Sequence, residues 1–277
     1  MSPDVMFPNN RLALFSAGFV ALLIVVAICA GWISPYDPAV QDLANRLNGP
    51  STTHWLGSDE LGRDVLSRVI YGTRISITVS VAVMLVSFLI GSYLGAIGGY
   101  FNGSLDLVLN IVLINSFMAF PGVLLAIAFI AFLGPGLSRL ILALCLIGWI
   151  GFARLARAQF LKTKEMDFVT AARASGASSA RVIFIHMVPN TIQPIVVQAC
   201  LGMANTILAE ATLSFLGLGV PPPTPSWGSM LNDGRIHLFD APHLVLFPAV
   251  AVMLAVLAFN FLGDALRDFF DTKGSKL

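Results

Sequence analysis

The stretch FVTAARASGASSARVIFIHMVPN, residues 168–190, is small, basic and rich in alanine and serine. It interrupts a chain of 277 residues, of which 57% are hydrophobic and only 11% are charged. A soluble domain carries about 25% charged residues, so this composition indicates an integral membrane protein. A segment like residues 168–190 gains nothing in lipid, and we therefore expect it to form a loop at one face of the membrane.

Six apolar stretches around this loop are long enough to cross a membrane as helices. A hydrocarbon core of roughly 30 Å requires about 20 apolar residues in a helix. The stretches cover about 12–33, 75–98, 107–133, 137–153, 191–219 and 244–263. The first has no convincing cleavage site after it, so we expect a retained helix and not a signal peptide. The sequence predicts an all-α membrane protein with six transmembrane helices.

Two of these spans carry features that change their expected shape. The third contains Pro121, and a proline removes one helix hydrogen bond, which predicts a kink. The fourth continues as RLARAQFLKTK, residues 154–164, so we expect its end to project from the membrane as a helix.

The basic residues of the connections predict the orientation, because lysine and arginine are enriched in cytosolic loops. With the N-terminus inside, the internal segments hold Arg11, Arg154, Arg157, Lys162, Lys164, Arg173, Arg181, Arg267, Lys273 and Lys276. The external segments hold the smaller set of Arg46, Arg63, Arg68, Arg74, Arg139 and Arg235. The opening stretch is therefore placed in the cytosol, within a loop over residues 154–190, and both termini lie on the same side.

This loop is expected to contain two short helices. The first, over about 165–175, is rich in alanine, and Gly176 supplies a left-handed stop. Ser178 or Ser179 can cap the second helix, which we expect Pro189 to end. The second helix is nearly all apolar and should lie against the membrane domain. The first has small side chains that leave room for another protein, although a loop that only packs on its own bundle is the alternative.

The stretch resembles the EAA loop of ABC importer permeases, and more narrowly that of the oligopeptide/dipeptide/nickel permease family. The matching positions are Ala171, Ala172, Gly176 and Pro189, while Thr170 stands in place of the usual glutamate, and His186 and Val188 also depart from the pattern. The resemblance implies an ATPase-coupling role for Thr170, Ala171, Ala172, Gly176, Ala177 and Pro189.

Other motifs in the same order are similar to the C-type subunit of this family. They are HWLGSDELGRDVLSRVIYGTRIS (54–76), MAFP (118–121), EATLSFLGLGVPPPTPSWGSML (210–231) and NFLGDALRD (260–268). One departure is in the third span, where relatives usually carry an arginine and an aspartate. Here Val112 and Asn115 stand at those positions.

The resemblance implies a type I ABC permease fold and a set of partners. Its five-helix core would cover 73–264, preceded over 1–72 by a cytosolic N-terminus, the first span and an external segment, and followed by a cytosolic tail over 265–277. The implied partners are a related B-type permease in a heterodimer, one or two ATP-binding subunits that bind ATP and magnesium, an extracytoplasmic solute-binding protein and the lipid of a bacterial inner membrane. No cofactor is expected in this chain. The net charge of +1 argues against nucleic acid as a partner.

Several residues are candidates for contact with the solute or with the binding protein. Glu210 lies inside a span, where an ionisable group normally faces protein or water. We interpret it, with Asn115 and Pro121, as part of a substrate path or gate, or alternatively as a structural hydrogen-bond acceptor. An external helix is expected after Ser58, with Asp59–Arg63 and Asp64–Arg68 pairs. The candidate contacts with the binding protein are Asp59, Arg63 and Trp227, and Trp227 could also anchor at the membrane interface.

Motifs for other functions are missing from the sequence. No G-x-x-x-x-G-K-[ST] phosphate loop and no H-E-x-x-H or G-x-S-x-G pattern occurs, so we expect a non-catalytic permease subunit. Cys29, Cys145 and Cys200 lie in apolar runs and are expected to be buried small hydrophobes. We expect the solute to be a di- or oligopeptide. Nickel or a metal–chelator complex and glutathione remain alternatives, and an ion-coupled secondary transporter or a membrane-embedded enzyme are the alternatives from other classes.

Overall fold

Helices form every regular element of residues 11–274, the part of the chain that the computed structural model describes. Five helices in this part are long and apolar enough to cross a membrane, and they cover Leu12–Ile33, Val65–Phe101, Leu137–Lys164, Ser179–Phe215 and His243–Phe270. A bent pair, Gly103–Met118 and Gly122–Leu133, provides a sixth span if it crosses as one unit. The expected all-α membrane fold is confirmed.

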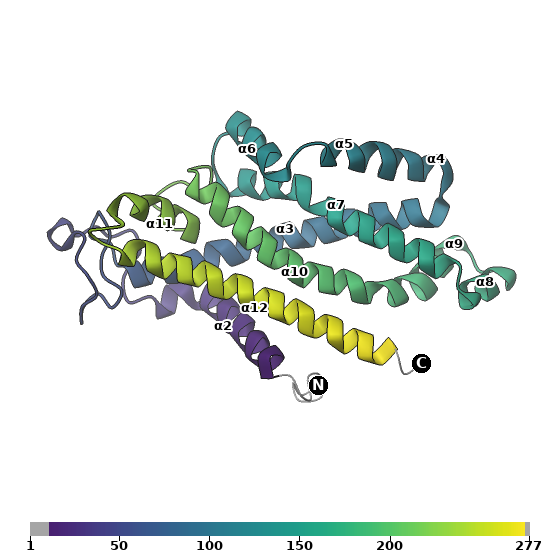
Figure 1. Ribbon diagram of the computed structural model, residues 1–277, viewed down its shortest axis with the longest axis horizontal. Helices are drawn as coiled ribbons and strands as arrows, with labels where there is room; N and C mark the ends of the chain where they lie inside the picture. Colours follow the sequence, from purple (N-terminus) through teal and green to yellow (C-terminus); the bar gives the residue numbers. More distant parts are fainter. Residues whose placement is uncertain (1–10, 275–277) are drawn as a thin grey trace.

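The long helices lie lengthwise in an elongated bundle (Figure 1). They are α2 (Arg11–Ile33), α3 (Val65–Phe101), α7 (Leu137–Lys164), α10 (Val188–Phe215) and α12 (His243–Gly274). The short helix α8 (Asp167–Ala174) lies at one end of the bundle, and α11 (Trp227–Gly234) lies at the other (Figure 1). We call these the α8 end and the α11 end. The α8 end and the α11 end are thus separated by the length of the spans.

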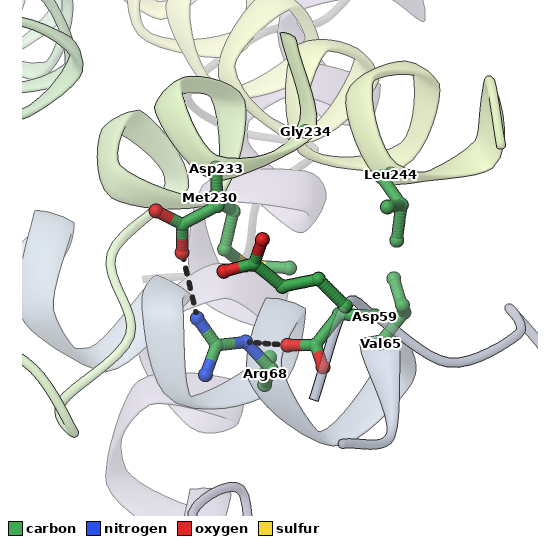
Figure 2. Close-up of a pocket in the computed structure, with 8 residues that line it drawn as sticks. Asp59, Val65, Arg68, Met230, Asp233, Gly234 and Leu244 are labelled. Atoms are coloured by element: carbon green, nitrogen blue, oxygen red, sulfur yellow. Dashed lines mark ion pairs between the residues drawn. The ribbon is translucent and has the colours of Figure 1, made fainter. Parts of the chain in front are cut away.

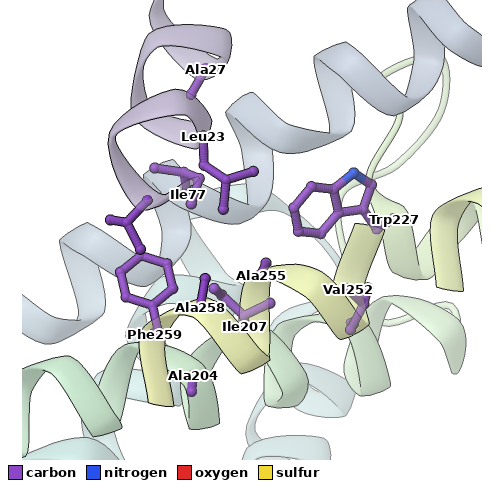
Figure 3. Packing of buried hydrophobic residues seen from close by; sticks show 12 residues of the cluster. Leu23, Ala27, Ile77, Ala204, Ile207, Trp227, Val252, Ala255, Ala258 and Phe259 are labelled. Atoms are coloured by element: carbon purple, nitrogen blue, oxygen red, sulfur yellow. The ribbon is translucent and has the colours of Figure 1, made fainter. Parts of the chain in front are cut away.

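The first span is part of the same bundle as the others, because it contributes to a shared apolar core (Figure 3). Leu23 of α2 packs in this core with Ile77 of α3, Ile207 of α10 and Phe259 of α12. Alanines fill the places between these larger side chains, which lets the helices approach one another closely.

Trp227, the first residue of α11, completes this core and is fully buried. Its indole Nε1 donates a hydrogen bond to the carbonyl oxygen of Val69 at 3.1 Å. Gly72 makes room for the ring, since a Cβ at that position would lie 2.8 Å from Trp227 Cδ1. The expectation that Trp227 anchors at the membrane interface was wrong, because α11 folds back onto α3 and turns the ring inward.

A row of glycines joins α3 to α7. A Cβ at Gly91 would lie 2.3 Å from the carbonyl oxygen of Trp149, and a Cβ at Gly95 would lie 2.2 Å from that of Ala153. Gly99 continues the row one turn later against Arg157. These glycines recur every fourth residue and therefore lie on one helix face, where they allow two backbones to touch.

The third span is broken rather than gently kinked. It consists of α4 (Gly103–Asp106), a π-helix η2 (Leu107–Ile114), α5 (Asn115–Met118) and α6 (Gly122–Leu133). The segments before and after Pro121 meet at 79°. The kink predicted at Pro121 is thus present, as a sharp change of helix direction.

The fifth span begins earlier than expected. After α8, the helix starts with α9 (Ser179–Arg181), continues through a π-helix η3 (Val182–Met187) and passes into α10 without a break in the helical run. Pro189 lies in the first turn of α10 and does not end the helix, so that expectation was wrong. The wider turns of η3 come directly before it, and a proline in the first turn of a helical segment forfeits little hydrogen bonding.

Candidate functional site

The turn after α8 has the geometry expected from its sequence. Gly176 has a φ of +79°, which is the left-handed region that glycine adopts at low cost. Its N–H donates to the carbonyl oxygen of Arg173 at 2.9 Å, and the N–H of Ala177 donates to that of Ala172 at 3.1 Å. This paired arrangement is a Schellman motif. Ser178 then caps α9 by accepting a hydrogen bond from the N–H of Arg181.

The predicted coupling residues form a small exposed surface at the α8 end. Thr170, Ala171 and Gly176 are exposed, and Ala172 and Ala177 are half-buried. No atom lies within 4 Å of the place that a Cβ of Gly176 would occupy. Pro189 is also exposed, but it belongs to α10. The small side chains at these positions of α8 are thus exposed or half-buried.

Tyr100, at the end of α3, connects this surface to the spans. The guanidinium carbon of Arg173 lies 5.1 Å from the centre of the Tyr100 ring, which is a cation–π contact. Lys164, the last residue of α7, donates to the carbonyl oxygen of Tyr100 at 2.8 Å. The ring itself packs with Phe160 of α7 and Val169 of α8. Tyr100 is thus in contact with side chains of both α7 and α8.

A second contact near this end links the broken third span to α7. Arg157 donates from Nε and Nη2 to the two carboxylate oxygens of Asp106, both at 2.6 Å. A bidentate pair of this kind fixes orientation as well as distance. It connects the start of the third span to the fourth.

Glu210 is completely buried within α10. Its two carboxylate oxygens accept hydrogen bonds from Ser76 of α3 and Ser214 of α10, both at 2.7 Å. These contacts favour a structural role between two spans. Asn115 and Pro121, which were expected to share a path with it, are exposed on the third span. The structure does not bring these three residues together, and their role in a substrate path stays a prediction.

The segment after Ser58 forms a loop and not the expected external helix. α3 begins at Val65, and Asp64 caps it by accepting hydrogen bonds from the N–H and Oγ of Ser67 at 2.7 and 2.6 Å. Asp64 also accepts from Nδ1 of His54 at 2.9 Å, so it does not pair with Arg68. Gly62 has a φ of +73°, and a Cβ there would meet the backbone of Asp42. The backbone at Gly62 is therefore not helical, and a residue with a side chain could not take this conformation without moving Asp42.

Charged residues of this loop, of α3 and of α11 form a compact cluster at the α11 end, and Figure 2 shows Asp59, Arg68 and Asp233 of it. Asp59 accepts from Nε of Arg63 at 2.7 Å and lies 3.3 Å from Nε of Arg68. Asp233 of α11 lies 3.5 Å from the Nη2 of Arg68. Burial raises the pKa of the Asp233 carboxyl, and the two arginines oppose that change.

Asp59 and Arg63 are 6% and 5% exposed, and Trp227 is fully buried. These three residues were expected to contact a binding protein. The structure places them inside the fold instead, because each has a partner within the chain. They support the surface at the α11 end and are not themselves part of it.

Three site features were missed by sequence reasoning. Tyr100, Arg68 and the Asp106–Arg157 pair acquire their contacts only when distant segments meet. The sequence offered one signal, which was the concentration of arginine beside apolar spans at residues 63, 68 and 157. In the described residues, no group of three or more His, Cys, Asp or Glu side chains could hold a metal ion.

Comparison with known proteins identifies the family. Residues 87–276 match the family described as binding-protein-dependent transport system inner membrane component, and residues 6–50 match the N-terminal TM domain of oligopeptide transport permease C. The chain belongs to the ABC importer permeases of the peptide/nickel family. It is a multi-pass inner membrane protein, and its permease fold implies partnership with ATPase subunits and a binding protein.

Similar proteins cover nearly the whole chain. The glutathione transport system permease protein GsiD of Escherichia coli O1:K1 / APEC is 46% identical over 268 residues, which are 96% of this chain and 88% of GsiD. The GsiD of Pectobacterium atrosepticum is 42% identical over 268 residues, which are 96% of this chain and 89% of that protein. Among solved structures, the inward-facing MetNI methionine ABC transporter superposes with a TM-score of 0.60 at 18% identity, covering 74% of this chain and 97% of that chain. This likeness supports the type I permease fold.

Proposed function

We propose that this permease subunit forms half of a path for short peptides, and for glutathione in particular. The observation that supports this is the 46% identity to a glutathione permease over 96% of the chain. Glutathione is a small peptide with free carboxylates, so it lies within the class expected from the sequence. Nickel and metal–chelator complexes remain the second candidate, with family resemblance alone in their favour.

The subunit contributes half of the substrate path and the contact through which movement of the ATPase subunits reaches the spans. ATP hydrolysis itself takes place in the partner subunits. A related B-type permease completes the path, and ATP-binding subunits dock against the exposed face of α8. ATP binding shifts the balance between two arrangements of the spans because the ATPase pair contacts α8 differently in each. Arg173, Tyr100 and Lys164 carry that difference from α8 to α3 and α7.

This assignment requires the α8 end and both termini to face the cytosol. A protease-cleavable tag after Leu277 should be cut only from the cytosolic side, and a tag inserted at Ser51 should be cut only from outside. Ser51 is exposed in the segment before α3, at the opposite end from α8. Cleavage of the Leu277 tag by protease added outside intact cells would reverse the assignment of every loop.

The substrate is tested with the assembled transporter in proteoliposomes and its cognate binding protein. ATP-dependent uptake of labelled glutathione and of a labelled dipeptide should be measured against uptake of nickel. Uptake of either peptide that stops without ATP supports the proposal. Uptake of nickel alone would contradict the substrate, and uptake driven by a proton gradient without ATP would contradict the mechanism.

A further inference from the structure

The break in the third span interrupts the backbone hydrogen bonding near the middle of that span. Pro121 has a ψ of 122°, which is extended backbone, and it supplies no side-chain cap to α6. The first N–H groups of a helix have no partner inside that helix. Ala119, Phe120 and Pro121 are all exposed on the side of the bundle that carries α5 and α6 (Figure 1). Non-helical backbone at membrane depth requires protein or water around it, so this side of the break does not face lipid hydrocarbon.

A pocket of about 270 Å³ opens at this break. Phe117, Met118 and Phe120 line it from the third span, and Ile147 and Ile150 line it from the middle of α7. A single water needs roughly 10–15 Å³ of such space, so the pocket is large enough for part of a small peptide. The side chains that line it are apolar and bring no charge of their own.

One positive charge lies at the rim of this pocket. Arg154 follows Ile150 by one turn of α7, toward the α8 end, and its Nη1 donates to Sδ of Met118 at 3.5 Å. A thioether is a neutral and weak acceptor. Arg154 is exposed and forms no ion pair among the described residues, so its guanidinium is accessible and its charge is not balanced by a carboxylate.

The neighbouring arginine does not share this property. Arg157 binds both carboxylate oxygens of Asp106 at 2.6 Å, so these two charges balance each other. Asn115, one turn before Met118 on the third span, is uncharged. The rim of the pocket therefore carries the unbalanced charge of Arg154 beside apolar walls.

We propose that this pocket is a subsite of the solute path, in which Arg154 binds a carboxylate of the passing peptide. Arginine suits this group because its planar fork of donors matches the two oxygens of a carboxylate. The apolar walls contact the rest of the peptide. The inference rests on the proposed function, because glutathione and short peptides are the solutes that bring a carboxylate into the path. An anionic lipid headgroup is disfavoured as the ligand, since the exposed break borders the same pocket.

Met118 offers a test that keeps Arg154 in place. Met118→Glu puts a carboxylate within reach of the guanidinium, where it competes with the solute, and Met118→Gln is the matched uncharged variant. Arg154→Gln is the complementary change. Lys162→Gln controls for the loss of one positive charge from α7, because Lys162 is exposed and does not line the pocket. All variants are made in the complete transporter, and the Met118 pair remains informative if Arg154→Gln fails to assemble.

The measurement is equilibrium binding of labelled glutathione to the complete transporter in nanodiscs of neutral lipid. Glutathione amidated at its carboxylates is the second probe. Met118→Glu should bind glutathione about tenfold more weakly than Met118→Gln, and Arg154→Gln about tenfold more weakly than Lys162→Gln, which is the scale of one hydrogen bond to a charged group. The amidated probe should bind weakly and equally to all variants.

Equal glutathione affinity in Met118→Glu and Met118→Gln would overturn the inference, as would a wild type that binds no glutathione. Stimulation of ATP hydrolysis by anionic lipid that is lost in Arg154→Gln, with glutathione binding unchanged, would assign the arginine to a lipid headgroup and also overturn it. Normal ATP-dependent glutathione uptake with equal affinities would reject the subsite alone. Charge-dependent binding without uptake of glutathione or of the dipeptide would keep the subsite and reject the proposed function.

Discussion

Glu210 shows how far a single residue could be interpreted from sequence. An acidic side chain inside a span indicates a functional or structural partner, and both were kept open. Its hydrogen bond to Ser76 could not be foreseen, because Ser76 is far away in the chain, whereas Ser214 lies one helical turn from Glu210. Gly176 is the opposite case. Its left-handed turn was predicted correctly, because glycine after a short alanine-rich helix is a local signal.

The contacts of Glu210 predict a structural phenotype. Glu210→Ala leaves the hydroxyls of Ser76 and Ser214 unpaired inside the bundle, which should cost about 1–3 kcal/mol. The thermal unfolding midpoint of the purified complex should fall, while the KM for the transported solute stays unchanged in Glu210→Gln. A changed KM in Glu210→Gln with an unchanged midpoint would instead place Glu210 in the substrate path.

At the scale of helices, hydropathy predicted where the spans lie. Local sequence signals did not predict correctly where individual helices begin and end. The loop before Val65 was expected to be helical from its charge spacing, yet Gly62 and the contacts of Asp59 hold it open. Pro189 was expected to end a helix that continues into α10. The residues after 264, which were expected to form a cytosolic tail, continue α12 as helix to Gly274, and their side of the membrane stays a prediction. In the first two cases the structure differs from the local signal because contacts with other segments decide the boundary.

Because α3 and α7 are in close contact, we expect a single added methyl group between them to lower the stability of the complex. Gly95→Ala would place a Cβ 2.2 Å from the carbonyl oxygen of Ala153, so the two helices must move apart. Overpacking of this kind costs about 1–3 kcal/mol. The yield and thermal midpoint of the complex should fall. Gly18→Ala in α2 is the matched control, because no atom lies within 4 Å of its new Cβ. Equal stability of the two variants would contradict the close contact.

We expect a substitution of Tyr100 to reduce the coupling between ATP hydrolysis and transport without changing the assembly of the complex. Tyr100→Leu removes the ring beneath Arg173, whereas Tyr100→Phe keeps it. We expect Tyr100→Leu to reduce the number of solutes transported per ATP hydrolysed, while the ATPase subunits remain bound. Tyr100→Phe should behave like the wild type, since the ring face carries the cation–π contact. Equal coupling ratios in Tyr100→Leu and wild type would remove Tyr100 from the path of transmission.

At the scale of the whole molecule, the fold class and family were predictable because composition and several ordered motifs pointed the same way. The partners at the two ends were predictable only through that resemblance. The charged cluster at the α11 end was not predictable, since Asp233 meets Arg63 and Arg68 there from a segment far along the chain. Long-range pairing of charges leaves no periodic signal in the sequence.

The central claim is that α8 couples this permease to ATP hydrolysis. Gly176→Val tests it, because a β-branched residue at a φ of +79° costs about 1–2 kcal/mol or more and redirects the turn after α8. Gly103→Val is the matched control, since Gly103 also has a positive φ and open space around it but lies outside α8.

The measurement is the amount of ATPase subunit retained on the purified permease pair and the ATP-dependent uptake of solute, taken from the same preparation. Gly176→Val should insert and pair normally, yet lose uptake together with solute-stimulated ATP hydrolysis or the ATPase subunits themselves. Gly103→Val should keep both. Normal retention and normal uptake in Gly176→Val would contradict the account and make this loop a packing element of its own bundle.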